Sequence, residues 1–251
     1  MNIGIIGAGN IARALARGWN RPLLCADPVF DRAQELARLT GGAALPSNAA
    51  VAAQADLVVL CHKPGQLAEV AGEIAGDAKA VVSILAATAL GDLKSAYPDR
   101  AVYRMLPSLP VEVRQGAVVQ ALDEDQDDPL DQHVHDLFAE LGTLVVLEDR
   151  LIDVAMGLMS CAPAYVALIA EAQIDAGVRR GIPSAQGAEL VVATLAGTAE
   201  LLSSRGYDTL AVRREVTSPG GTTAKGLDAL ERGGVRAAFS DALDAVLGEP
   251  Q

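Results

Sequence analysis

The chain opens on a short apolar run that passes through glycines into a helical pattern, "NIGIIGAGNIARALARGW". Gly7-x-Gly9-x-x-Ala12 has the spacing of a turn that carries a dinucleotide pyrophosphate. Gly7 allows the tight turn, Gly9 lets the backbone approach the phosphates, and Ala12 lets the helix pack closely on the strand. Asn10 and Ile11 begin that helix, where oriented amides meet the positive end of its dipole. This opening predicts a parallel α/β fold that binds a dinucleotide.

The next segments alternate short apolar runs with helical patterns, which is typical of βαβ units around a parallel sheet. Strand signals are essentially absent after Glu148, where apolar helical stretches follow. We therefore predict an α/β chain with a Rossmann-type parallel-sheet domain over residues 1–150 and an all-helical domain over residues 151–251. The helices are too apolar for a free-standing bundle, which favours a homodimer or a higher homo-oligomer formed through the C-terminal domain. Further strands are expected at "PLLCAD", "LVVLCH", "AVVSIL", "AVYRML", "GAVVQAL" and "TLVVLE".

Charge and cysteine usage narrow the classes of partner. The net charge of −12 argues against nucleic acid and against anionic membranes. The three cysteines, Cys25, Cys61 and Cys161, are scattered through apolar surroundings, which suits a reducing compartment. A strand pattern begins at residue 2 without a basic leader or cleavage site. These features predict a soluble, cytoplasmic protein.

Two further stretches could indicate a membrane span or a metal site, and the sequence supports neither. Residues 151–170 are apolar, but Asp153 and Pro163 interrupt them, so buried helices are favoured over a membrane span of ~20 residues. The acidic run "DEDQDDP" at 123–129 is typical of a solvated turn. No second pair of cysteines or histidines with ligand spacing is present, so no metal site is predicted.

Asp27 ends the second expected strand, at the position where an acid accepts hydrogen bonds from the adenosine ribose. Such an acid repels a 2′-phosphate, which favours NADH. Arg32 is close enough in sequence to face that phosphate, so NADPH stays open as the alternative.

Residues at the carboxyl ends of two other strands are further candidates for cofactor binding, because such ends line the crevice of a parallel sheet. In "LCHKPGQ" these are His62, Lys63 and Pro64. In "SILAAT" they are Ala86 and Ala87, which would border the nicotinamide. The alternative for each is simple termination of a buried strand.

A second glycine turn, "VTSPGGTTAKGL" at 216–227, precedes a helix near the C-terminus. Gly220 and Gly221 free the backbone to point amides inward, while Thr222 and Thr223 add hydroxyls at the helix start. A small carboxylate bound there would meet amides, hydroxyls and a helix N-terminus together. The alternative, a well-capped helix after a glycine turn, explains one Ser or Thr but not so many hydroxyls and glycines together.

These segments, together with "HKPGQ", "YRMLPSLP" and "CAPAYV", stand in an order that resembles the pyrroline-5-carboxylate reductases, from residue 2 to about residue 247. The resemblance implies a helical domain that interlocks into a dimer, and NAD(P)H-dependent reduction of 1-pyrroline-5-carboxylate to L-proline. It implies that Ser218 and Thr223 contact the substrate, with Thr223 a candidate to relay a proton to the ring nitrogen. It also brings Ser108 to the cofactor and Cys161 to the substrate.

The chain departs from the family pattern at Ser108, where the family has Asn, and at Cys161, where it has Ser. His62 replaces the usual Val. The first two changes reduce the hydrogen-bonding capacity of these side chains, so a related cyclic imine remains an alternative substrate. A β-hydroxyacid dehydrogenase-like enzyme would need a Lys and an Asn in its interdomain helix, and residues 163–178 contain neither. A catalytically silent dinucleotide-binding regulatory protein is the remaining alternative.

Overall fold

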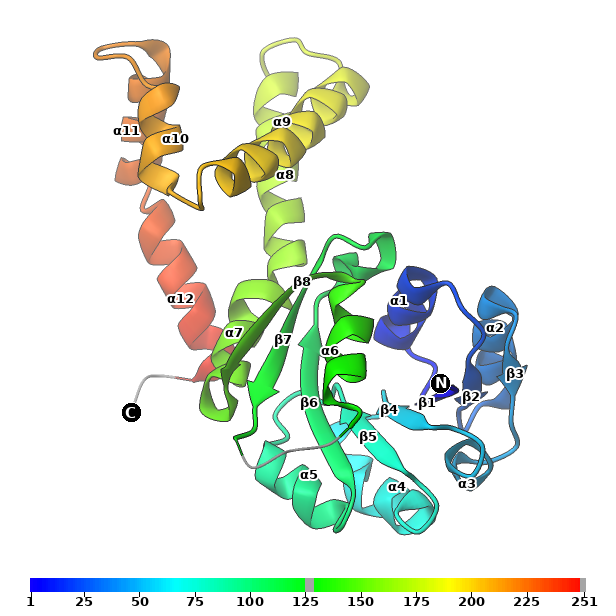
Figure 1. The fold of residues 1–251 in the computed structure, drawn as a ribbon. Helices are drawn as coiled ribbons and strands as arrows, with labels where there is room; N and C mark the ends of the chain where they lie inside the picture. Colours follow the sequence, from blue (N-terminus) through cyan, green and yellow to red (C-terminus); the bar gives the residue numbers. More distant parts are fainter. Residues whose placement is uncertain (125–128, 249–251) are drawn as a thin grey trace. The chain divides into compact units, whose positions relative to one another are not determined.

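A computed structural model describes residues 1–124 and 129–248, and the chain divides into two compact units, residues 1–163 and 164–251. The first unit is an eight-stranded sheet with helices on both faces (Figure 1). The predicted α/β class is therefore confirmed. The domain boundary at residue 150 stays a prediction, since contacts divide the chain after Pro163, in the first turn of a helix.

The sheet has the strand order β3-β2-β1-β4-β5-β6-β7-β8. Neighbouring strands from β3 to β6 are parallel, β7 is antiparallel to β6, and β8 is parallel to β7. All seven predicted strands are present. The two-residue β3 was not predicted, because two alanines carry no strand pattern. The strands are β1 (Ile3–Ile6), β2 (Leu24–Ala26), β3 (Ala43–Ala44), β4 (Leu57–Leu60), β5 (Ala80–Ser83), β6 (Ala101–Pro107), β7 (Gly116–Leu122) and β8 (Gly142–Glu148).

Helices cover both faces of this sheet and enclose two apolar cores. One face carries α1 (Asn10–Trp19), α2 (Phe30–Thr40) and α6 (Asp131–Ala139). The other carries α3 (Asn48–Ala52), α4 (Leu67–Ile74), α5 (Leu90–Ala96) and α7 (Ile152–Met159). Three short 3₁₀ helices complete the unit: η1 (Pro64–Gln66), η2 (Leu109–Val113) and η3 (Asp149–Leu151). Within the predicted acidic turn, residues 125–128 lie outside the described residues.

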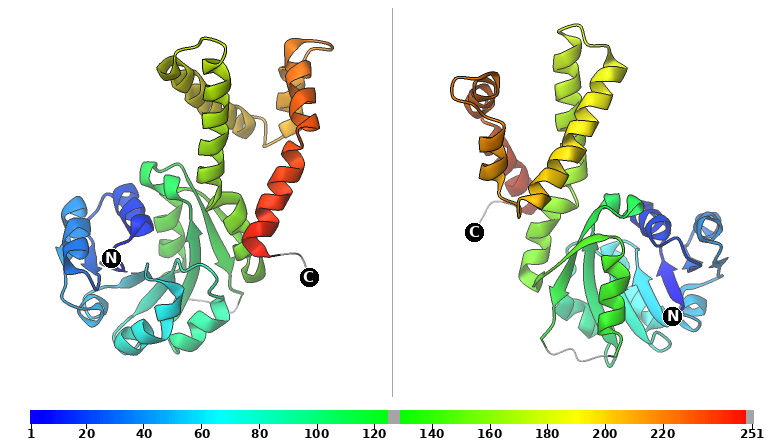
Figure 2. Two further views of the ribbon diagram at one scale, coloured as in Figure 1. Left: turned by 180° about the vertical axis from the view of Figure 1, so that it is seen from behind. Right: turned by 45° about the horizontal axis from the view of Figure 1, so that its top comes forward.

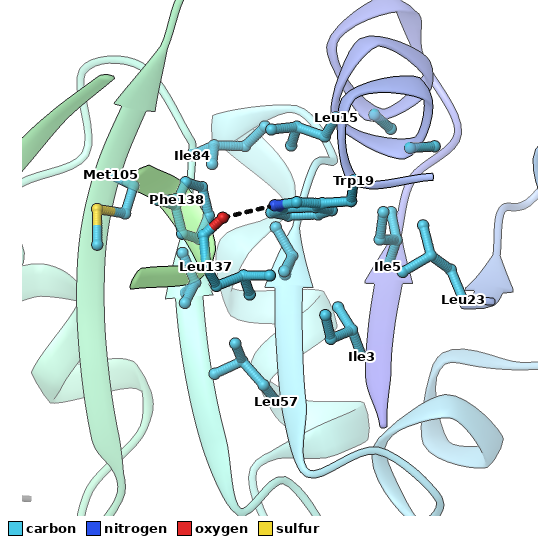
Figure 3. Packing of buried hydrophobic residues seen from close by; sticks show 14 of the residues in the cluster. Ile3, Ile5, Leu15, Trp19, Leu23, Leu57, Ile84, Met105, Leu137 and Phe138 are labelled. Atoms are coloured by element: carbon cyan, nitrogen blue, oxygen red, sulfur yellow. Dashed lines mark hydrogen bonds between the residues drawn. The ribbon is translucent and has the colours of Figure 1, made fainter. Parts of the chain in front are cut away.

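The chain's single tryptophan organises the first core (Figure 3). Trp19, at the end of α1, is 1% exposed, and its indole nitrogen donates a hydrogen bond to the Leu137 carbonyl at 2.8 Å. Its ring meets Phe138 edge-on, with centroids 5.3 Å apart. Since a buried indole N–H needs a partner, this bond fixes α1 against α6 and with it the glycine turn that precedes α1.

The second unit is entirely helical among its described residues. Its helices are α8 (Ala162–Val178), α9 (Ser184–Ser204), α10 (Thr209–Glu215), α11 (Thr222–Arg232) and α12 (Val235–Leu247). The views in Figures 1 and 2 agree that α10 and α11 lie side by side, and Arg213 faces Glu231 across them at 3.8 Å.

This helical unit has almost no core of its own. Among the described residues 164–248, Val212 is the only apolar side chain that is fully buried. Leu168, Leu190 and Tyr207 are 64%, 60% and 71% exposed. A folded unit gains its stability by burying apolar surface, and the helices of this unit leave these side chains uncovered.

The expectation of buried helices over residues 151–170 is only half met. In α7, Ile152 and Ala155 are buried, whereas every residue of α8 is at least partly exposed. Asp149–Val178, with a mean hydropathy of 1.7, is the one described helical segment long and apolar enough to cross a membrane by length and composition alone. The exposure of α8 has a physical reason, because within its own unit few helices pack on it.

Candidate active site

A cleft lies where the chain leaves β1, β2 and β4. Because these strands are parallel and adjacent, their carboxyl ends meet at one edge, and the sheet's strand order reverses between β1 and β4. Ligands bind at such a switch point. The predicted cofactor residues that line the cleft are Gly7, Gly9, Asp27, His62 and Lys63. Sequence reasoning missed Ala8 and Asn48, which also line it.

Gly7 and Gly9 shape the turn in different ways. Gly7 has φ +96°, and a Cβ there would lie 2.7 Å from the Cys61 carbonyl carbon and oxygen. Its lack of a side chain is therefore required by the conformation and by the close passage of the next loop. A Cβ on Gly9 would meet nothing within 4 Å. The open space at Gly9, at the N-cap of α1, fits a pyrophosphate approached by the backbone.

Asp27 is engaged with the protein through both of its oxygens. Oδ2 accepts the Ala8 amide at 2.8 Å, and Oδ1 accepts the Val29 amide at 2.8 Å. The acid therefore ties the end of β2 to the glycine turn. Each oxygen keeps a second lone pair for a ribose hydroxyl. Arg32 lines the same cleft, is exposed, and forms no side-chain ion pair with any described residue.

His62 is held by its neighbour in the loop after β4. Its Nδ1 lies 2.9 Å from the Lys63 carbonyl oxygen, so this nitrogen is the protonated donor. Nε2 is buried and has no hydrogen-bond partner among the described residues. Burial lowers the pKa of His62 below its usual value and keeps the ring neutral. Lys63, by contrast, is exposed beside the cleft, as Pro64 is at the start of η1.

The first positions of α1 and the loop after β5 flank this cleft without lining it. Asn10 is exposed and Ile11 half-buried. Residues 84–89 follow β5, which pairs with β4 on the side away from β1. In this loop Ala86 is half-buried, and Ala87 is exposed with φ +51°, a left-handed conformation uncommon for a residue with a side chain.

Ser108 and Cys161 stand apart from the cleft. Ser108 is 3% exposed, and its hydroxyl accepts the Ala117 amide at 2.9 Å, so the side chain joins β6 to β7. Cys161 is half-buried at the junction of α7 and α8. The preceding Ser160 hydroxyl donates to the Pro107 carbonyl at 3.1 Å, which holds this junction at the end of β6. The roles predicted for both residues stay predictions.

The second glycine turn lies in the helical unit, at the start of α11. Gly220 has φ +70°, and the Gly221 amide donates to the Ser218 carbonyl at 3.0 Å. Ser218, Thr222 and Thr223 are exposed, and the helix has no side-chain cap. No hydrogen bond within the described residues engages these three hydroxyls. They and the first amides of α11 are therefore available to one small anion.

A hollow beside this turn is positively charged at its rim. It is lined by Leu210, Arg213, Arg214, Thr217 and Leu227. The Thr217 hydroxyl is buried and has no hydrogen-bond partner among the described residues. Arg213 also faces Glu231 at 3.8 Å, whereas Arg214 forms no ion pair with a described residue, so one unpaired cation close to the turn of free hydroxyls favours an anionic ligand over a neutral one.

Two family models match separate parts of the chain. The family described as "NADP oxidoreductase coenzyme F420-dependent" matches residues 2–87, and "Pyrroline-5-carboxylate reductase dimerisation" matches residues 149–249. The first covers the predicted glycine turn and cleft. The second covers α7, all of the helical unit and the turn at 216–227.

Several relatives that match over almost the whole chain are named pyrroline-5-carboxylate reductase. The chain is similar to a pyrroline-5-carboxylate reductase of Thermus thermophilus, 35% identical over 98% of this chain and 95% of the relative. It is similar to the crystal structure of 1-pyrroline-5-carboxylate reductase from Streptococcus pyogenes, 29% identical, with a TM-score of 0.89 over 98% of this chain and 96% of that one. The Plasmodium falciparum pyrroline carboxylate reductase structure, with NADP bound, is 25% identical, with a TM-score of 0.87 over 98% and 95%.

Proposed function

The chain belongs to the pyrroline-5-carboxylate reductase family, and we propose that it reduces 1-pyrroline-5-carboxylate to L-proline with NAD(P)H. One observation carries this proposal from the structure itself. The chain holds two glycine turns of different kinds before helices, one made of backbone and the other rich in free hydroxyls. A reductase with a large phosphorylated cofactor and a small carboxylate substrate needs both kinds.

The cleft of the first unit fits a dinucleotide. A Cβ at Gly7 would collide with the following loop, while the space at Gly9 is open, so the turn can receive a pyrophosphate against the N-terminus of α1. When bound, NAD(P)H supplies the hydride. Gly7, Gly9 and Asp27 hold and orient the adenosine-diphosphate portion, and the loop 84–89 is assigned to the nicotinamide end.

We further propose that NADH is preferred over NADPH. The Asp27 carboxylate lies at the end of β2, where a 2′-phosphate would meet its charge. Arg32, also in the cleft, offsets part of that repulsion, which supports use of both cofactors with a moderate preference. The relative with NADP bound has the same fold and supports NADPH as one usable cofactor.

The turn at 216–227 is proposed to hold the substrate carboxylate. Gly220 and Gly221 let amides converge, and Ser218 and Thr223 offer hydroxyls that no described residue uses. A pyrroline imine is readily protonated, so the protein needs no strong general acid. Thr223 is proposed to pass the proton to the ring nitrogen, while positioning of the ring carbon supplies most of the rate gain.

We propose that the helical unit pairs with that of a second chain. Val212 alone is fully buried among its described residues, and Leu168 and Leu190 lie exposed. The match to a dimerisation family over residues 149–249 supports a second copy as the cover. In Asp149–Val178, α7 is already buried on the sheet, and burial of α8 between subunits would account for the remaining apolar surface without a membrane, which agrees with a cytoplasmic enzyme.

The deciding experiment follows cofactor oxidation by the purified chain with pyrroline-5-carboxylate, and with its six-membered homologue, using NADH or NADPH. Turnover of the five-membered imine with NADH as the better donor is expected. Faster turnover of the six-membered ring would assign a related imine. Absence of turnover with either imine, while cofactor still binds, would leave the silent regulatory protein as the answer.

A further inference from the structure

A buried arginine joins the sheet to α7. Arg104, in the middle of β6, is 2% exposed. Its Nη1 donates to Asp149 Oδ1 at 2.8 Å, and its Nη2 donates to Asp153 Oδ1 at 2.7 Å. A guanidinium removed from water is stable only when carboxylates pair with it. The two acids therefore fix η3 and the first turn of α7 on β6.

Asp149 has a second partner on another element. Its Oδ2 accepts the amide of Leu90 at 3.1 Å, the first residue of α5. The N-cap residue Ala89 has no side chain that could take this amide, so Asp149 caps α5 from a distance of 59 residues in sequence. One carboxylate thus links the buried arginine to the end of the loop after β5.

That loop holds a strained backbone at the cofactor edge. Ser83 is paired with Arg104 in the register of β5 and β6, so loop 84–89 leaves the sheet beside the arginine. Ala87 has φ +51°, which persists only where the surroundings impose it. Within the loop, Thr88 donates its hydroxyl to the Ala86 carbonyl at 3.1 Å. Beyond it, the loop is anchored through Leu90 to Asp149.

We propose that Arg104 and Asp149 are positioning residues for hydride transfer: together they hold loop 84–89 in the conformation that receives the nicotinamide end of the cofactor. The inference rests on the proposed function for the assignment of this loop. The arginine supplies charge that keeps Asp149 in place, and Asp149 acts on the loop through the Leu90 amide. Neither side chain touches the reacting atoms.

The test compares Asp149→Asn with Asp123→Asn in the full chain. Asp123 pairs with Lys94 of the same helix α5 at 2.6 Å, so its variant removes an ion pair from α5 and leaves the Leu90 cap intact. Hydrogen exchange over residues 84–90 and the NADH dissociation constant are measured by mass spectrometry and by fluorescence titration. Neither measurement needs an imine, so failure of the proposed reaction would not affect them.

Asp149→Asn should speed exchange over residues 84–90 and lower kcat by about tenfold, because small misplacement of a reacting group is costly. Asp123→Asn should change neither. Arg104→Lys, which keeps a charge, should show weaker forms of the same two effects. Arg104→Met, which removes the charge, should show both effects in full. If Asp149→Asn or Arg104→Lys folds with normal exchange over residues 84–90 and an unchanged NADH dissociation constant, the network only supports α7 and the proposal is wrong.

Discussion

The Asp27 carboxylate accepts the Ala8 backbone amide at 2.8 Å, so the end of β2 is bound directly to the glycine turn after β1. The acid expected to read the ribose is thus also part of the support of the phosphate-binding turn. Its second oxygen holds the Val29 amide at the same distance. The shape of the turn therefore depends on the same side chain that we propose discriminates between the cofactors.

Substitution of Asp27 should separate these two roles. Asp27→Asn keeps an acceptor oxygen and removes the charge, so we expect NADPH to gain on NADH by about tenfold, since opposition to the 2′-phosphate is lost. Asp27→Ala should weaken both cofactors as well, because each lost bond to a charged acceptor is worth about 1.5–3 kcal/mol. Dissociation constants for both cofactors measure the two effects. Arg32→Ala is the matched control and should weaken NADPH alone; unchanged discrimination in Asp27→Asn would contradict the ribose role.

The two turn glycines should respond differently to a methyl group. Gly7→Ala places a Cβ 2.7 Å from the Cys61 carbonyl at φ +96°, and should cost at least about 2 kcal/mol of unfolding free energy. Gly9→Ala meets nothing within 4 Å, so its stability should be normal while cofactor affinity falls. Urea unfolding and cofactor titration measure the pair. Normal affinity in a folded Gly9→Ala protein would show that the pyrophosphate lies elsewhere.

Thr223→Ala should lower kcat/KM for the imine by roughly ten- to a hundredfold, the value of one hydrogen bond to a charged group. The NADH dissociation constant should not change, since this hydroxyl belongs to the substrate turn. Steady-state kinetics and cofactor titration test both statements. Lys225→Ala, two residues further along α11, is the control and should retain full activity. An equal loss of cofactor binding in Thr223→Ala would overturn the assignment.

His62 should make stability depend on pH. Burial lowers its pKa in the folded protein, so the unfolded chain binds a proton more readily. This contribution to stability is complete above the unfolded value near 6.5 and is lost as the pH falls through it toward the folded pKa. The free energy of unfolding, measured in urea at about pH 7.5 and about pH 5.5, should fall less between these two values for His62→Gln than for the parent chain. Equal losses would mean that the ring is protonated without cost.

Leu168→Asp should abolish oligomers. Leu168 of α8 is 64% exposed in the single chain, and a carboxylate buried at a subunit contact is costly. Sedimentation or size-exclusion with light scattering should show monomers and a loss of turnover. Leu39→Asp, at a side chain 46% exposed on α2, should keep the parent's mass. A Leu168→Asp protein that remains oligomeric would place the contact on another surface.

Much of the fold follows from local pattern, whereas the details of the site depend on distant partners. Apolar runs predicted every strand except β3, and the glycine spacing predicted the turn at the cleft. Arg104 was missed, because within "AVYRML" it reads as an ordinary polar residue of a strand, and its two carboxylates lie 45 and 49 residues away.

Other features of the structure were also missed because the local sequence pattern does not determine them. The left-handed backbone of Ala87 was not predicted, because alanine carries no sequence signal for that conformation. The Ser108 hydroxyl accepts the Ala117 amide of a neighbouring strand, a contact that the sequence did not predict, and its role at the cofactor stays a prediction. The exposure of α8 was not predicted. Its apolar composition indicates that the helix surface will be buried, but composition does not show whether the same chain or a second chain buries it.

The position of Trp19 allows the unfolding of the two units to be followed separately by spectroscopy. It is the only indole in the sequence, it is buried in the sheet-containing unit, and the helical unit has none. Its emission therefore reports the melting of one unit, whereas circular dichroism near 222 nm is dominated by helices and records both. Heating the protein at several concentrations should show whether the two signals part, and so whether separation of subunits precedes loss of the nucleotide-binding core.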